Sequence, residues 1–210
     1  MKLYGYWRSS ASWRVRIGLA LKGVEVEHHS VHLVQDGGQQ HAADHLQRNP
    51  MRQVPVLELD DGRQLTQSLA ILEYLDARYP EPKLLPSDPY LRARARALTE
   101  VVNSGIQPLQ NLATLQHLTR LGVDRMAWGR HYIHQGLLNL QTMAEHTAGH
   151  FLVGDDVSLA DIALIPQLYN ARRFAVPLDD LSLLLDVEAR CEALDAFQAA
   201  HADQQPDATR

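Results

Sequence analysis

The stretch Trp7–Arg16 places hydroxyl and guanidinium groups where a short apolar run gives way to a helical pattern. Ser9 and Ser10 stand at this point, with Arg8 and Arg14 on either side. A helix N-terminus carries unpaired N–H groups and a partial positive charge, so it attracts anions. The pattern therefore predicts a site for an anion. It does not distinguish among a phosphate, a carboxylate and a thiolate.

The composition limits the class of protein that carries this site. The chain has 210 residues, 45% of them hydrophobic, which suffices for one large domain or two small ones. A net charge of -5 disfavours a nucleic-acid partner, because phosphate neutralisation needs clustered Lys and Arg. Cys191 is the single cysteine, which excludes an internal disulfide and fits a reducing compartment. Without a signal run or membrane span, we expect a cytoplasmic protein with no membrane partner.

The N-terminal part alternates strand and helix patterns, which suits a small mixed sheet covered by helices. The expected strands cover residues 3–6, 24–31, 54–59 and 64–66, and the expected helices cover 13–22, 39–48 and 68–79. The apolar residues expected on the inner faces of the first and last helices are Trp13, Ile17, Ala20 and Leu21, and Leu69, Leu72 and Leu75.

Pro55 falls inside the strand expected at 54–59. Proline has no N–H for a ladder, so it belongs at an edge, a bulge or a cis turn. A cis bond would leave the main chain of Val54 open to a ligand, whereas frequency alone favours an ordinary trans bond.

Four prolines within residues 80–89 indicate a stiff connector, and strand signals almost vanish beyond it. Helices are expected over 90–118, 124–147, 158–173 and 181–200. Ser158 and Asp161 form the pattern of a capping box. We therefore predict a domain over 1–80, a linker over 81–89 and an all-helical domain over 90–210.

Five blocks distributed along the chain narrow the interpretation. They are Ser9–Arg16, Asn49–Pro55, Gln67–Ile71, Gly105–Leu112 and Asn170–Phe174. Together with the α/β, connector and helical order, they resemble the zeta class of the glutathione transferase superfamily over essentially the whole length. The resemblance implies an α/β plus all-α fold, with a thioredoxin-like N-terminal domain, a helical C-terminal domain and a homodimer.

The resemblance also implies glutathione as a cofactor that is not consumed. Members of this class isomerise maleylacetoacetate or maleylpyruvate, because a thiolate can add to the double bond, let it rotate and leave again. The stretch Asn111–Thr114 resembles the maleylacetoacetate branch. The alternatives are maleylpyruvate isomerase, a transferase acting on α-halo acids, and a glutathione-binding module without turnover.

Roles for individual residues follow from the same resemblance. Ser9, Ser10 and Arg14 are the expected catalytic residues, since hydroxyl donors, a helix N-terminus and a cation keep a thiol ionised. The residues expected to contact glutathione are Ser9, Ser10, Gln40, Val54, Gln67, Ser68, Gln107, Asn111 and Ala113. Arg8 and Arg173 are expected to bind a dicarboxylate or ketoacid substrate, because guanidinium matches carboxylate in two hydrogen bonds.

Each residue also has an ordinary structural interpretation. Ser9 suits a helix N-cap, Gln67 and Ser68 suit a cap of the next helix, and the arginines suit a solvated surface. Gln107, Asn111 and Ala113 suit helix packing.

The histidine pairs at 41/45 and 131/134 have helical spacing but no accompanying metal motif, so we expect solvated helix faces and no metal. Cys191 lies in an apolar context and is expected to be inert. Ala11 stands where the zeta pattern commonly has cysteine, which leaves isomerisation by glutathione possible and puts any use of a protein thiol there in doubt.

Overall fold

The computed structural model describes residues 1–208 and separates into two compact units. The first unit contains Met1–Leu84 together with the chain from Leu194 onward, and the second contains Leu85–Ala193. The predicted combination of an α/β part and an all-helical part is confirmed. Residues 194–208 lie outside the helical unit, whereas the sequence placed them in a domain over 90–210.

The first unit is built on a four-stranded sheet in the order β2-β1-β3-β4. The strands are β1 (Lys2–Gly5), β2 (Glu27–Ser30), β3 (Val56–Glu58) and β4 (Gln64–Thr66). β1 runs parallel to β2 and antiparallel to β3, with Leu3 opposite His28 on one side and Leu57 on the other. β3 and β4 form a hairpin. All four strands predicted along the chain are therefore present.

Strand β2 begins three residues later than predicted. Gly23 takes a left-handed φ of 62°, and the N–H of Val24 donates to the carbonyl of Leu19 at 2.9 Å. These contacts close the preceding helix in the manner of a Schellman motif. Val24 therefore completes a helix end, and pairing with β1 starts only at Glu27.

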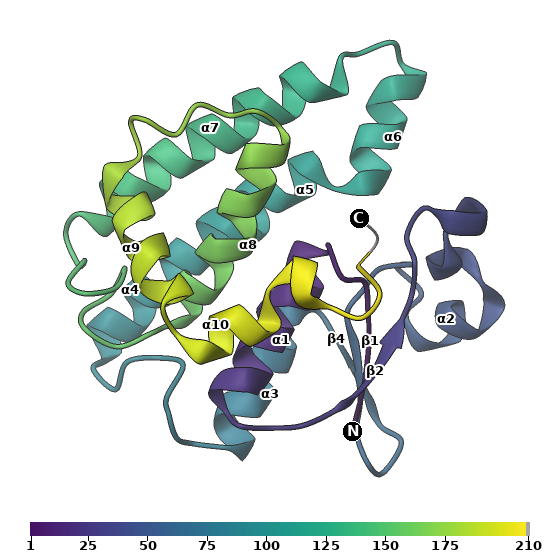
Figure 1. Cartoon of the computed structure of the whole chain (residues 1–210), viewed down its shortest axis with the longest axis horizontal. Helices are drawn as coiled ribbons and strands as arrows, with labels where there is room; N and C mark the ends of the chain where they lie inside the picture. The colour runs from purple at the N-terminus through teal and green to yellow at the C-terminus, as the bar shows by residue number, and fades with distance from the viewer. Residues whose placement is uncertain (209–210) are drawn as a thin grey trace. The chain divides into compact units, whose positions relative to one another are not determined.

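Helices cover both faces of the sheet (Figure 1). They are α1 (Ser10–Leu21), α2 (Ala43–Arg48) and α3 (Ser68–Arg78), with short 3₁₀ turns at Gln35–Gly37 and Gln39–His41. Side chains alternate along a strand, so Leu3 enters the core with α1 and α3 while Tyr4 faces α2. The guanidinium of Arg48 lies 4.4 Å from the Tyr4 ring centroid. The core residues shared by the sheet, α1 and α3 include Leu3, Val15, Leu19, Leu57, Ile71 and Leu75.

A helix from the end of the chain covers the remaining side of α1. The stretch expected as one helix over 181–200 forms α9 (Ser182–Glu192) and α10 (Asp195–Ala200), because Leu194 has extended angles of -89° and 130°. α10 packs against α1 within the first unit (Figure 1). The prediction of a one-sided α1 is therefore wrong: Val15 and Ile17 are both fully buried, while Ala20 is only partly so.

The second unit is built from helices and the loops that connect them, with no β-strand among its described residues. Its helices are α4 (Pro89–Glu100), a π-helical turn (Val101–Ile106), α5 (Gln107–Gln110), α6 (Leu112–Arg120), α7 (Arg125–Ala144), α8 (Leu159–Arg173) and α9. The continuous helix expected over 90–118 is broken, because Asn111 is extended with ψ of 145° and caps α6. Among residues 1–208, no helix is long and apolar enough to cross a membrane.

The predicted capping box at the start of α8 is confirmed. Asp161 is fully buried, and its Oδ2 accepts the N–H and the hydroxyl of Ser158, both at 2.8 Å. Its Oδ1 accepts the N–H of Leu152 at 2.9 Å. Burial raises the pKa of Asp161, and these hydrogen bonds oppose the rise. The carboxylate therefore joins the loop before α8 to the helix.

Replacing Asp161 with alanine will leave buried donors of Leu152 and Ser158 without an acceptor. We expect Asp161→Ala to lower the free energy of unfolding by about 3 kcal/mol, measured by urea titration followed by circular dichroism. Asp156→Ala, which removes an exposed carboxylate five residues earlier, is the matched control and should change it by less than about 0.5 kcal/mol. Equal effects of the two variants would contradict this role.

Candidate functional site

Ser9 lies between β1 and α1 and is the N-cap of that helix. Its Oγ accepts the N–H of Ser12 at 3.3 Å, and its own N–H donates to the Tyr6 carbonyl at 3.0 Å. The capping interpretation is therefore confirmed. Within residues 1–208 the Ser9 hydroxyl makes no hydrogen bond as a donor, so its proton is available to an anion. Ser10 follows as the first helical residue and is 9% exposed.

Ser12 supports this junction through a buried contact that the sequence pattern did not indicate. The side chain is fully buried, and its Oγ accepts the N–H of Tyr6 at 3.4 Å. A side chain on Gly5 would lie 3.2 Å from that oxygen. The small residue in β1 thus lets the first turn of α1 sit close to the strand.

Arg14 links the first turn of α1 to the beginning of α3. It is 1% exposed, and its Nη1 donates to the Ser68 hydroxyl at 3.1 Å. The solvated-surface interpretation of Arg14 is therefore wrong. The guanidinium adds a full positive charge where two helix N-termini each contribute a partial one.

The start of α3 differs from an ordinary capped helix. Gln67 is the N-cap residue, with φ of 68° and ψ of 117°, and its side chain makes no capping hydrogen bond. Its Nε2 instead donates to the Met51 sulfur at 3.5 Å. A non-glycine residue with positive φ is costly and recurs where a site requires it. The interpretation of Gln67 as a plain capping side chain is therefore wrong.

The Val54–Pro55 peptide bond is cis, against the frequency-based expectation. Val54 lies two residues before Val56, the first residue of β3 that pairs with β1, so its main chain lies outside that ladder. Two side chains hold the preceding loop: His45 Nε2 lies 3.0 Å from the Gln53 carbonyl, and Asn49 Nδ2 donates to it at 2.8 Å. His45 is 2% exposed, so the expected solvated face is wrong at that position.

Gln40 is buried beside the same sheet. Its Nε2 donates to the Leu33 carbonyl at 3.2 Å, while its Oε1 is buried without a hydrogen-bond partner in the described part of the chain. A Cβ at Gly38, where φ is 97°, would lie only 2.5 Å from Nε2. Gly38 therefore makes room for the buried amide group of Gln40.

Arg8 extends from the turn before Ser9. It is partly buried, and its guanidinium carbon lies 5.1 Å from the centroid of the Trp7 ring. The stacked contact is a cation–π interaction that orients the side chain without neutralising its charge.

The remaining predicted residues lie in the second unit and are described within it. Asn111 is the N-cap of α6, and its Oδ1 accepts the N–H of Ala113 at 3.0 Å. Gln107 is the first residue of α5. Arg173 is the last residue of α8, is exposed, and donates to Asn170 Oδ1 at 3.0 Å. Their ligand-binding roles stay predictions.

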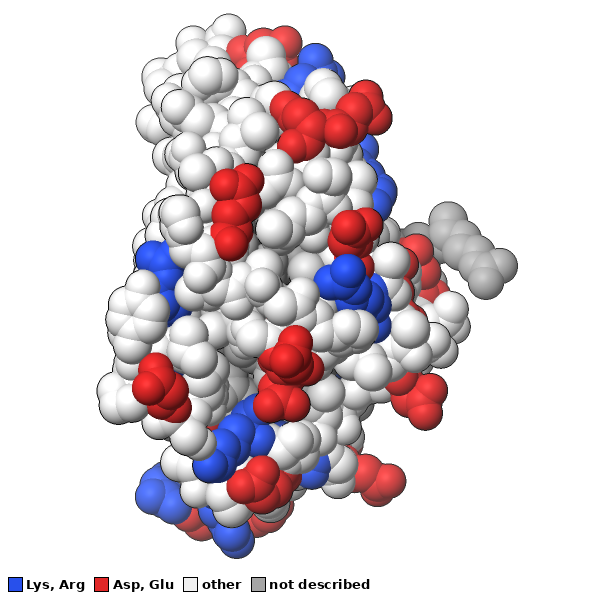
Figure 2. Space-filling view, turned by 90° about the vertical axis from the view of Figure 1, so that its left-hand side faces the viewer, with Lys and Arg blue, Asp and Glu red and all other residues white. Residues whose placement is uncertain are grey.

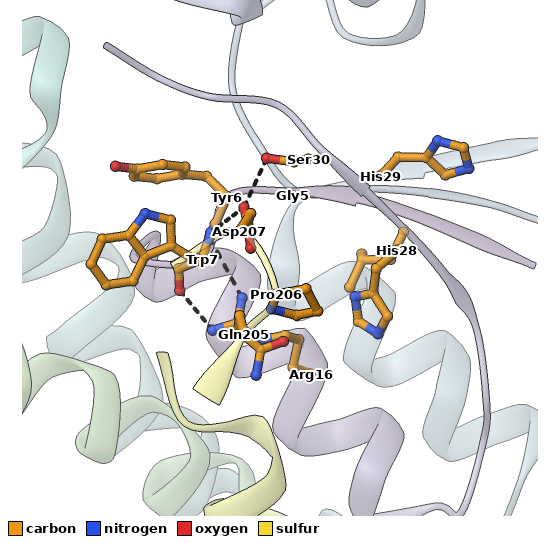
Figure 3. A pocket seen from close by; sticks show the side chains of 11 residues that line it. Gly5, Tyr6, Trp7, Arg16, His28, His29, Ser30, Gln205, Pro206 and Asp207 are labelled. Atoms are coloured by element: carbon orange, nitrogen blue, oxygen red, sulfur yellow. Dashed lines mark hydrogen bonds between the residues drawn. The ribbon is translucent and has the colours of Figure 1, made fainter. Parts of the chain in front are cut away.

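A cavity of about 120 Å³ lies behind the Tyr6–Trp7 turn (Figure 3). It is lined by Arg16, His28, Asp207 and neighbouring residues, and by none of the serines at 9, 10 or 68. Burial lowers the pKa of His28, and the charge of Arg16 lowers it further. The cavity is therefore separate from the hydroxyl groups of the predicted site.

Charge is distributed without a single dominant sign on the face drawn in Figure 2, where acidic and basic side chains alternate with uncharged ones. Among residues 1–208, no group of three or more His, Cys, Asp or Glu is placed to hold a metal ion.

Comparisons with known proteins agree with this geometry. Residues 1–77 match the family model of the glutathione S-transferase N-terminal domain. Mouse maleylacetoacetate isomerase is 45% identical over 98% of this chain and 94% of its own length. A bacterial zeta-class glutathione S-transferase, described as the holo structure of maleyl pyruvate isomerase, is 39% identical, covers 100% of both chains and has a TM-score of 0.95.

The chain belongs to the zeta class of glutathione transferases. A further member, maleylacetoacetate isomerase from Anaeromyxobacter dehalogenans 2CP-1, is 51% identical with a TM-score of 0.90, covering 100% of this chain and 97% of its own. Its crystal structure holds dicarboxyethyl glutathione and citrate in the active site. The family model matches residues 1–77, which form most of the thioredoxin-like first unit.

The only thiol of this zeta-class chain is buried in α9. Cys191 is fully buried, and burial raises the pKa of its thiol far above the ordinary value. We expect no reaction of the native protein with an aromatic disulfide reagent, and one reacting thiol per chain in urea. Ala11→Cys, which places a thiol in the first turn of α1, is the control and should react in the native state. Rapid native labelling of Cys191 would contradict the burial.

Proposed function

We propose that the chain is a glutathione-dependent cis–trans isomerase that converts maleylacetoacetate to fumarylacetoacetate. The observation that carries the proposal is the Ser9 hydroxyl, which has a proton to donate at the N-terminus of α1. Arg14 connects that helix to Ser68, where α3 begins. The names of the mouse and Anaeromyxobacter relatives support the same reaction.

Several features of the first unit fit glutathione. The main chain of Val54 lies outside the sheet ladder and suits the cysteinyl unit of the tripeptide. Ser68 and the uncapped N–H groups of α3 suit the γ-glutamyl carboxylate. The buried Oε1 of Gln40, which has no hydrogen-bond partner among the described residues, can accept the N–H of the glycyl unit.

Bound glutathione would supply a thiolate that adds reversibly to the double bond, so that the bond can rotate. Ser9 donates a hydrogen bond to the sulfur, and the N-terminus of α1 favours its negative charge. The positive charge of Arg14, which contacts Ser68 at the start of α3, adds to the stabilisation of the thiolate. Arg8 binds a substrate carboxylate, or stabilises negative charge that develops at the conjugated carbonyl.

The relative with bound dicarboxyethyl glutathione supports this chemistry. Addition of a thiolate to a four-carbon cis-enedioic acid gives a product of that composition. A thiolate and a diacid are therefore the reactants that this class of site brings together.

Maleylpyruvate isomerase is the second candidate, favoured by the TM-score of 0.95 with the zeta-class structure of that name. Steady-state rates of the purified protein with each substrate, in the presence of glutathione, decide between the two. The proposal expects a higher kcat/KM for maleylacetoacetate, with no net loss of thiol. Consumption of thiol with an α-halo acid and no isomerisation would indicate a transferase instead.

The role of Ser9 can be separated from its capping. Glycine is nearly as good an N-cap as serine but has no hydroxyl. We expect Ser9→Gly to lower kcat by roughly 10²–10³-fold, as loss of one donor to a developing charge does, with glutathione affinity changed only a few-fold. Ser9→Thr retains the hydroxyl and should keep most activity. Ser182→Gly, at the exposed start of α9, is the control; an unchanged kcat in Ser9→Gly removes Ser9 from the mechanism.

The charge of Arg8 can be tested with the substrate dianion. We expect Arg8→Met to raise KM for the substrate roughly tenfold or more, because a charged hydrogen bond is lost, while glutathione affinity stays the same. Arg63→Met removes an exposed arginine of the β3–β4 hairpin and should leave both constants unchanged. A normal KM in Arg8→Met would refute the carboxylate role.

The family resemblance also supports a homodimer. Sedimentation equilibrium should give twice the chain mass at micromolar concentration, and a monomer would contradict the proposal.

A further inference from the structure

We propose that Asp207 and Arg16 are positioning residues that hold the Tyr6–Ser9 turn, and through it the Ser9 hydroxyl, in place. The inference rests on the proposed role of Ser9. It gives the C-terminal segment that carries Asp207 a role in positioning this residue. Neither side chain is among the residues expected to contact glutathione or substrate.

Asp207 reaches the turn from the opposite end of the sequence. Its Oδ2 accepts the main-chain N–H of Trp7 at 3.2 Å and the hydroxyl of Ser30, in β2, at 2.8 Å (Figure 3). One carboxylate oxygen therefore joins the tail to β2 and to the residue two positions before Ser9.

Arg16 holds the same peptide from the side of α1. Its Nη2 donates to the Trp7 carbonyl at 2.8 Å, and its Nη1 lies 3.5 Å from the Tyr6 carbonyl (Figure 3). Its Nε donates to the Ala200 carbonyl at 3.2 Å, at the end of α10. The main-chain N–H and the main-chain carbonyl of Trp7 are thus both held by charged side chains from outside the turn.

The charges of the two residues support each other. Arg16 is 6% exposed, and burial lowers its pKa to about 10, while the negative charge of Asp207 opposes that shift. The guanidinium therefore remains protonated at neutral pH and keeps all of its donors. His28 also faces this cavity, and burial lowers its pKa, so a neutral ring there adds no competing charge.

The tail is itself attached firmly enough to act on the turn. Gln205 Nε2 donates to the carbonyls of Ala199 and His201 at 3.1 and 2.9 Å. α10 packs along α1 in the same unit. A carboxylate two residues further on is therefore held against a fixed frame.

A shift of the Trp7 main chain should also move Ser9, because the two residues are only two positions apart. The N–H of Ser9 donates to the Tyr6 carbonyl at 3.0 Å, which links Ser9 directly to the residue before Trp7. A displacement of about 1 Å of a catalytic group costs roughly 10²-fold in rate. We call the contacts of Asp207 and Arg16 with the main chain of Trp7 the clamp. Loss of the clamp should therefore lower kcat and the ionised fraction of the bound glutathione thiol. Glutathione should still bind through Val54 and Ser68.

The test compares Asp207→Ala and Asp207→Asn with Asp203→Ala, which removes an exposed carboxylate from the same tail. We expect Asp207→Ala to lower kcat at least about tenfold and to raise the pKa of the bound glutathione thiol, read from thiolate ultraviolet absorbance. Glutathione Kd should change less than threefold. Asp207→Asn keeps an acceptor for Trp7 and should recover part of the lost rate, and the control should match the wild type.

Two results would overturn the inference. One is a kcat and a bound-thiol pKa in Asp207→Ala equal to those of the control. The other is unchanged amide hydrogen exchange over residues 6–12 in that variant. The exchange measurement needs neither substrate nor glutathione, so it still decides the clamp if the wild type proves inactive, in which case only the proposed function fails.

Discussion

The enclosure of α1 between the sheet with α3 and α10 is the constraint on which the first unit depends. The sheet and α3 cover one side of the helix, and α10 covers another. Arg14 and Arg16 are consequently 1% and 6% exposed, and a buried guanidinium without partners would cost several kcal/mol. Their acceptors are the Ser68 hydroxyl and the carbonyls of Tyr6, Trp7 and Ala200. The contacts of Arg16 with the Tyr6 and Trp7 carbonyls thereby hold the segment that leads to Ser9.

Much of the candidate site is made by the main chain rather than by reactive side chains. The first N–H groups of α1 and α3, the peptide groups of Val54 and the left-handed Gln67 are all conformational features. Ser9 combines both kinds of contribution, since its oxygen accepts from Ser12 while its proton is left to donate. A hydroxyl can do both because it has one donor and two acceptor lone pairs. The structural and functional interpretations of Ser9 are therefore compatible.

Local patterns predicted the elements that depend on local contacts. The positions of the four strands along the chain, the inward leucines of α3 and the capping box of Ser158 and Asp161 all agree with the structure. The errors lie where distant segments intervene. The one-sided pattern assigned to α1 ignored α10, and the single helices expected over 90–118 and 181–200 missed the extended residues at Asn111 and Leu194.

The sequence by itself predicted an anion site between the first strand and helix, because a cap, a helix N-terminus and its flanking hydroxyls lie within one turn of chain. It also determined the family, through motifs spread over the whole length. Only the tertiary structure decided which partners hold that site. Ser68 lies 54 residues from Arg14, Ala200 lies 184 from Arg16, and Asp207 lies 200 from Trp7. Contacts at such separations leave no periodic signal, because they arise only when folding brings the chain ends together.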